Sequence, residues 1–252
     1  MLTAKKSRYK SYKERAQPLF FINDAPRTCG PTIIGHLNFM EPKRKNIFFT
    51  SDWHIGHASV LVYDKRPFKD LNHMHRVLIN NYNACVSTNG ICYFLGDVGL
   101  TKSDNITKII KQLNGTKVLI LGNHDNNTYS MYEKGFDVVL NTAVFYIADK
   151  RISMSHCPLP GIFREDVSGM KNSKEGENWH GEHKNQRFTN QDLTADYHIH
   201  GHIHSTPDNE KPKKTDRQFD VGVAANNYRP ISISEIESWI ALEEQKKTKK
   251  LS

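Results

Sequence analysis

Seven side chains of metal-binding types follow short apolar runs in this sequence. They are, in chain order, Asp52, His54, Asp97, Asn123, His156, His202 and His204, and the runs are 46–50, 91–95, 117–121, 151–155 and 195–200. Their donor atoms are oxygen or nitrogen and never sulfur, which fits hard or borderline divalent cations and argues against a soft, structural site. Seven donors suffice for two ions when one carboxylate is shared, the arrangement that two-metal hydrolysis uses.

Each of these residues has an ordinary structural explanation when it is considered alone. Asp52 would serve as a helix N-cap and Asn123 as a turn residue. His202 and His204 would share one face of any strand, because side chains alternate with a period of two. Seven such coincidences at the ends of apolar runs are not expected together, so we interpret the set as a metal site.

The segments that must position these residues alternate between strand and helix patterns. Apolar runs predict strands at 46–50, 91–95, 117–121, 195–200 and 218–223, and 137–148 with 151–155 predicts a hairpin. Helical spacing predicts helices over 70–86, 105–113 and 234–247, the last with Ser234 as N-cap and Glu237 completing a capping box. This order predicts an α/β body with a mixed sheet, whose ligands lie beyond the carboxyl ends of the strands.

The order of the motifs resembles the calcineurin-like metallophosphoesterase superfamily over about residues 46–240. The motifs are Asp52-x-His54, Gly96-Asp97, Gly122-Asn123-His124-Asp125, His156 and Gly201-His202-x-His204. The sequence around Arg66-Pro67-Phe68 and Val221-Gly222-Val223 is similar to that of the small bacterial and phage branch of the superfamily. The resemblance implies a four-layer αββα sandwich with two mixed β-sheets.

The resemblance also implies a role for each motif residue. One metal would take Asp52, His54, Asp97 and His204, and the other would take Asp97, Asn123, His156 and His202, with Asp97 as the bridge. A hydroxide between the ions would attack phosphorus, and His124 would act on the leaving group as the catalytic histidine. Mn²⁺ is the favoured ion, with Fe, Zn, Ni or Mg as alternatives.

The substrate prediction depends on the residues immediately after the Gly-Asp motif. Protein Ser/Thr phosphatases of the superfamily carry an Asp and an Arg there, and residues 98–102 contain neither. We therefore expect hydrolysis of a phosphodiester, with a nucleotide or cyclic nucleotide favoured. A nuclease acting on DNA or RNA ends is the alternative enzyme. A non-catalytic scaffold of the same fold is less expected, because such proteins lose ligands that this chain retains.

Three further features leave alternatives open. His57 would either contact the substrate phosphate or hold a metal ligand through a hydrogen bond. Asp125 would either orient His124 or point elsewhere. The polar segment 168–192, which contains Trp179, His180 and His183, would be a lid or an ordinary surface loop.

Charge and composition divide the chain. The net charge is +8, and residues 1–46 carry ten Lys and Arg against three acids. We predict a basic N-terminal extension at 1–45, a catalytic domain at 46–242 and a basic tail at 243–252. The extension would offer a contact for nucleic acid. No apolar run has the length of a membrane span, and no apolar stretch follows the basic first residues, so we expect neither a membrane span nor a secretory signal. The four cysteines form no CxxC pair and are expected to be reduced thiols in the cytoplasm. The oligomeric state stays open.

Overall fold

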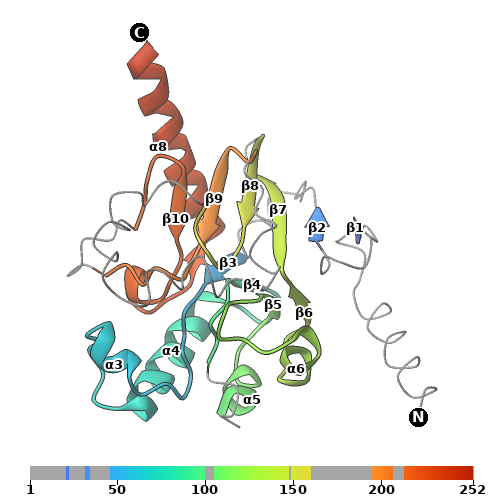
Figure 1. Cartoon of the computed structure of the whole chain (residues 1–252), viewed down its shortest axis with the longest axis vertical. Coiled ribbons are helices and arrows are strands. Elements are labelled where there is room, and N and C mark those ends of the chain that lie inside the picture. Colours follow the sequence, from blue (N-terminus) through green and yellow to red (C-terminus); the bar gives the residue numbers. More distant parts are fainter. Residues whose placement is uncertain are drawn as a thin grey trace, which may run out of the picture.

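The computed structural model describes residues 21–22, 32–34, 46–99, 105–147, 149–159, 194–206 and 213–251 (Figure 1). The strands in these ranges are β1 Phe21–Ile22, β2 Thr32–Ile34, β3 Ile47–Thr50, β4 Ile91–Phe94, β5 Thr116–Ile120, β6 Val138–Leu140, β7 Thr142–Ile147, β8 Lys150–Met154, β9 Tyr197–His200, β10 Gln218–Asp220 and β11 Ile231–Ser232. The helices are α3 Val60–Tyr63, α4 Leu71–Cys85, α5 Asn105–Ile110, α6 Thr128–Glu133 and α8 Ile233–Leu251, with a 3₁₀ turn η3 at Ala224–Asn226.

The strands form two mixed sheets. In the five-stranded sheet the order is β11-β3-β4-β5-β6, and all neighbours are parallel except β11. In the six-stranded sheet the order is β1-β2-β7-β8-β9-β10, and β8, β9 and β10 are parallel neighbours. Figure 1 shows α3 to α6 gathered on one side of the molecule and α8, in red, at the other end. The predicted α/β fold with two mixed sheets and flanking helices is confirmed.

The alternation of side chains along β4 fills both spaces beside the five-stranded sheet. Cys92 and Phe94 face the helices, where the Phe94 ring lies 5.8 Å from that of Tyr82 on α4. Tyr93 faces the other sheet, and its ring lies 5.1 Å from that of Phe145 on β7. A strand buried on both faces has a continuous apolar run, which is why the composition of 91–95 predicts a strand.

Helix α4 forms where apolar side chains recur every four residues. Met74, Leu78 and Tyr82 are buried on one face. The Asp70 side chain caps the helix by accepting a hydrogen bond from the backbone N–H of His73 at 2.8 Å.

The capping box of α8 lies two residues earlier than predicted. The Ser232 Oγ accepts from the Glu235 N–H, and the Glu235 carboxylate accepts from the Ser232 N–H at 2.9 Å. Strand β11 passes into α8 without a loop, so the prediction of Ser234 and Glu237 is wrong. The helix then runs through the predicted boundary at 242/243 to Leu251.

The predicted strand 137–148 is divided between the two sheets. Strand β6 pairs with β5, whereas β7 pairs with β2 and β8. Only Asn141 separates β6 from β7. A continuous apolar run has the same pattern whichever sheet it joins, because pairing partners and not side chains decide the sheet. The predicted hairpin of 137–148 with 151–155 is therefore confirmed only for β7 and β8.

Two segments discussed in the sequence analysis lie largely or wholly outside the residues that the structure describes. Strands β1 and β2 fall inside the segment predicted as an extension. The polar segment 168–192, with Trp179, His180 and His183, lies outside the described residues, and so does the choice between a lid and an ordinary surface loop. Among the residues that the structure describes, no helix is both long and apolar enough to span a bilayer.

Candidate metal centre

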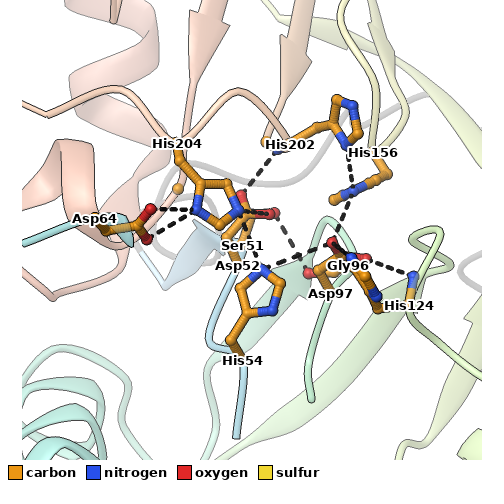
Figure 2. Close-up of polar contacts among 12 residues, drawn as sticks. Ser51, Asp52, His54, Asp64, Gly96, Asp97, His124, His156, His202 and His204 are labelled. Carbon is orange, nitrogen blue, oxygen red and sulfur yellow. Dashed lines mark hydrogen bonds and ion pairs between the residues drawn. The ribbon is translucent and has the colours of Figure 1, made fainter. Parts of the chain in front are cut away.

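Backbone hydrogen bonds bring the ends of the ligand-bearing strands together. The Asp52 N–H bonds to the Gly96 carbonyl at 3.1 Å, which joins the ends of β3 and β4. The Gly201 N–H bonds to the His156 carbonyl at 2.9 Å, which joins the ends of β8 and β9. The His202 N–H donates to Asp52 Oδ2 at 3.0 Å and so connects the two sheets at this edge. The predicted ligands are thereby assembled from segments far apart in the sequence, such as those of Asp52 and His202, which are 150 residues apart (Figure 2).

Six of the seven predicted ligands form two triads. Asp52, His54 and His204 make the first, called here the Asp52 site, and Asp97, His156 and His202 make the second, called the Asp97 site. The donor atoms within each triad lie within 4.8 Å of one another. The seventh, Asn123, belongs with the Asp97 site, because its Oδ1 lies 2.9 Å from His156 Nε2 and 3.1 Å from His202 Nδ1.

Asp97 lies between the two triads. Its Oδ2 is 3.3 Å from His156 Nε2 in its own site and 3.7 Å from His54 Nε2 in the other. The same oxygen is 3.9 Å from Nε2 of His124, whose side chain is 46% exposed. This is the position expected of a carboxylate shared by two ions, with the partly exposed His124 beside it (Figure 2).

Two buried carboxylates dominate the electrostatics of the centre. Burial alone would raise the pKa of Asp52, but hydrogen bonding to His204 and the charge of nearby histidines hold this pKa well below its usual range. Burial opposes ionisation of Asp97 too, and His156 holds its pKa low. In return, and against the effect of burial, the carboxylates raise the pKa of His156 to about 9 and the pKa of His204 to about 10. Cations that bind here would replace the protons of these histidines.

Two observations favour a divalent ion over protons as the natural partner. Asp52 Oδ1 is buried and has no short hydrogen bond, since its contact with His204 Nε2 is 3.5 Å long, and an ionised oxygen in that state is costly unless a cation faces it. The backbone also bends to aim the donors inward, since Asp52, His54, Asp97, His202 and His204 all have φ between 51° and 71°. Strained conformations of this kind cluster at functional sites.

Glycines allow the strand ends to approach. Gly96 has φ of 87°, and a Cβ on it would lie 2.6 Å from His156 Nδ1. A Cβ on Gly201 would collide with Ser51 and Asp52. Any larger residue at either position would displace a ligand.

Asp125 does not orient His124. Its carboxylate accepts hydrogen bonds from the backbone N–H groups of Asp97, Val98 and Gly122 at 2.8–3.0 Å. It therefore fixes the turn after β4 against the turn after β5, and the second of the two alternatives from the sequence holds.

Asp64 is a residue of the centre that the sequence motifs do not indicate. Both of its carboxylate oxygens lie 2.8–2.9 Å from His204 Nδ1. Arg66 binds the same carboxylate through Nε and Nη2. The nearby Arg66-Pro67-Phe68 belongs to the sequence that carries the family resemblance and so points to this region. Asp64 itself does not follow a strand, so the pattern that located the other residues of the centre does not include it.

Two other histidines, His57 and His198, differ in their position relative to the centre. His57 is at the site, with Nδ1 3.4 Å from His54 Nδ1 and its ring 6.3 Å from that of His124. Both proposed roles for His57 stay open. His198 bonds to Ser153 and to the Cys157 carbonyl and belongs to the packing of the six-stranded sheet.

Comparisons with known proteins agree with this geometry. The family model of calcineurin-like phosphoesterases matches residues 45–206. An uncharacterized protein of Methanocaldococcus jannaschii, MJ1445, is 40% identical over 83 residues, which are 32% of this chain. Those residues cover 47% of MJ1445, so the chain spans about half the length of this relative.

Two solved structures are similar to this chain. A protein of unknown function from Aquifex aeolicus, AQ665, is 26% identical with a TM-score of 0.55, over 77% of this chain and 98% of that one. An archaeal phosphodiesterase is 14% identical with a TM-score of 0.36, over 70% of this chain and 81% of that one. The second likeness is too low to bear on substrate.

Proposed function

The chain belongs to the calcineurin-like phosphoesterase family, and from this premise we propose that it hydrolyses a phosphodiester with the help of two divalent metal ions. A nucleotide or cyclic nucleotide is the proposed substrate class, and Mn²⁺ is the proposed ion. The absence of the protein-phosphatase Asp and Arg from residues 98–102 supports a substrate other than a phosphoprotein.

One observation carries the proposal: the Asp97 carboxylate faces both triads and the exposed ring of His124 at once. A shared carboxylate favours two ions over one. Bound ions would supply Lewis acidity and lower the pKa of a bound water. The residues of this chain would hold those ions, keep other groups from pairing with the buried carboxylates and place His124 beside the substrate.

His124 is proposed to protonate the leaving oxygen. Its backbone N–H is anchored to Asp97 Oδ1 at 2.9 Å, while its ring extends toward solvent. This anchor fixes the ring beside the metal centre without making it a ligand. A proton donor there is typically worth about 10²–10⁴ in rate.

The test compares hydrolysis of bis(p-nitrophenyl) phosphate with hydrolysis of p-nitrophenyl phosphate. Wild type is assayed with Mn²⁺ and with chelator, beside His124→Ala and His73→Ala. His73, on α4, is outside the centre and serves as the matched histidine control. We expect Mn²⁺-dependent cleavage that favours the diester, unchanged in His73→Ala and about 10²-fold or more slower in His124→Ala.

Metal content separates the alternatives. His124→Ala should bind as much Mn²⁺ as wild type, because His124 is not among the two triads. A preference for the monoester would contradict the diester proposal and indicate a phosphatase or nucleotidase. Metal binding without turnover of either ester, or of DNA and RNA ends, would indicate a scaffold.

A further inference from the structure

A buried charged network lies behind one of the two triads. The Asp64 side chain is 7% exposed and that of Arg66 is fully buried. Asp64 lies at the end of α3, and neither residue belongs to a triad. Buried charges are costly unless they are paired, so their location directly behind His204 needs a reason.

The geometry at His204 supplies that reason. Asp64 Oδ1 and Oδ2 lie 2.9 and 2.8 Å from His204 Nδ1, so this nitrogen carries a hydrogen and donates it (Figure 2). The Nε2 atom then points the other way, 3.0 Å from His54 Nε2 and 3.5 Å from Asp52 Oδ1. A carboxylate behind a histidine in this manner fixes the ring and makes it a stronger ligand.

Arg66 ties this arrangement to a second ligand. Its Nη2 donates to Asp64 Oδ2 at 2.9 Å and to the backbone carbonyl of Asp52 at 2.9 Å. Its Nη1 donates to the carbonyl of Trp53 at 3.2 Å. One guanidinium therefore holds the orienting carboxylate and the backbone that carries Asp52. Lys65, between the two residues, has a left-handed φ of 47°.

The Asp97 site is supported differently. There the Nδ1 of His156 faces the backbone carbonyl of Leu95 at 2.7 Å. A neutral carbonyl thus stands where the Asp52 site has a carboxylate. His204 and His156 therefore differ in the charge behind them, and a change at Asp64 should affect only the Asp52 site.

We propose that Asp64 and Arg66 are positioning residues of the Asp52 site: Asp64 directs the Nε2 lone pair of His204 toward a metal ion, and Arg66 fixes Asp64 together with the Asp52 backbone. The proposal rests on the proposed function, because it takes the triads as metal sites. It adds two residues that touch neither the ion nor the substrate.

The test titrates the full chain with Mn²⁺ and follows stoichiometry and affinity by calorimetry. The variants are Asp64→Asn, Asp64→Ala and Arg66→Lys, and the matched control is Asp137→Asn. Asp137 pairs with a lysine as Asp64 pairs with Arg66, and it accepts a backbone N–H, but it lies on the surface beside β5. We expect wild type and Asp137→Asn to bind two Mn²⁺ per chain alike.

In Asp64→Ala one of the two binding events should weaken about 10–100-fold while the other stays unchanged. In Asp64→Asn the same binding event should weaken less than in Asp64→Ala, because the amide oxygen still accepts a hydrogen bond from His204 Nδ1. Arg66→Lys should weaken the same event, because a lysine cannot make the forked contact. The Mn²⁺-induced rise in melting temperature should shrink in the same order.

Three outcomes would overturn the proposal. Asp64→Ala could bind both ions as wild type does. Asp64→Ala could also have a lower melting temperature without metal and yet show the full Mn²⁺-induced rise, which would indicate that Asp64 has a purely structural role. Wild type that binds no Mn²⁺ would remove both this proposal and the proposed function. Wild type that binds two ions but hydrolyses nothing would contradict the function alone.

Discussion

Single residues at the centre adopt a backbone conformation that side chains usually avoid. Five of the seven predicted ligands have left-handed φ, at a cost of about 1–3 kcal/mol each for strained positions. Asp and His tolerate this region better than most residues. The positions of the candidate ligands could be predicted because they follow apolar strands, whereas their backbone strain and the contact of Asp64 with His204 could not. Asp64 follows a short helix, and only the folded chain brings it to His204.

Gly96→Ala tests this crowding. The new Cβ would meet both a forbidden φ and the ring of His156, so we expect stability to fall by about 1–3 kcal/mol and Mn²⁺ affinity to fall as well. Gly135→Ala is the control, because Gly135 has φ of 107° but its nearest side chain is Ile110, away from the triads. It should lose stability and keep Mn²⁺ affinity, as followed by urea denaturation and calorimetry. Equal Mn²⁺ affinity in both variants would show that Gly96 is needed for the backbone turn and not for Mn²⁺ binding.

At the scale of elements, the sequence located strands better than it located their boundaries and partners. The runs at 46–50 and 91–95 are buried on both faces, so their composition alone marks them as strands. The division of 137–148 at Asn141 could not be predicted, because sheet membership depends on distant pairing partners. The capping box of α8 lies two residues before the predicted one because Ser232-x-x-Glu235 and Ser234-x-x-Glu237 both match the pattern.

The two capping boxes make different predictions for α8. Ser232→Ala should destabilise the protein by about 1 kcal/mol, and Ser234→Ala, at an exposed position, should change little. Glu235 adds a dependence on pH. Hydrogen bonding to Arg229 lowers the pKa of Glu235 from 4.5 to about 2 in the folded chain. A folded-state pKa below the unfolded one stabilises the fold above about pH 4.5, and this is lost as pH falls toward 2.

Glu235→Gln should therefore be less stable than wild type at pH 7, with the difference shrinking between pH 4.5 and 2. The effect should stay within about 1 kcal/mol, because both partners are partly exposed. Urea denaturation at pH 7 and pH 3 measures it. A difference that is larger at pH 3 than at pH 7 would contradict the assignment of the cap.

On the scale of the whole molecule, the centre joins the two sheets. The predicted ligands Asp52, His54, Asp97 and Asn123 follow strands of the five-stranded sheet, and the predicted ligands His156, His202 and His204 follow strands of the other. The inter-sheet core is apolar, so the sheets are held together by packing over their faces and by this polar edge. Without cations, the edge carries two buried carboxylates whose pKa values are held low by neighbouring histidines against the effect of burial. Ions bound there would link the sheets directly.

Metal binding should therefore stabilise both sheets together. At Mn²⁺ one hundred times above its Kd, the native state gains about 2.7 kcal/mol per site, which corresponds to a rise of about 5–10 °C in melting temperature for a chain of this size. Chelator should reverse the rise, and Asp97→Ala should abolish most of it, because that carboxylate faces both triads. Hydrogen exchange should slow in peptides that contain β4 and in peptides that contain β8. Slowing in one sheet alone would mean that the ions bind at this edge without joining the sheets.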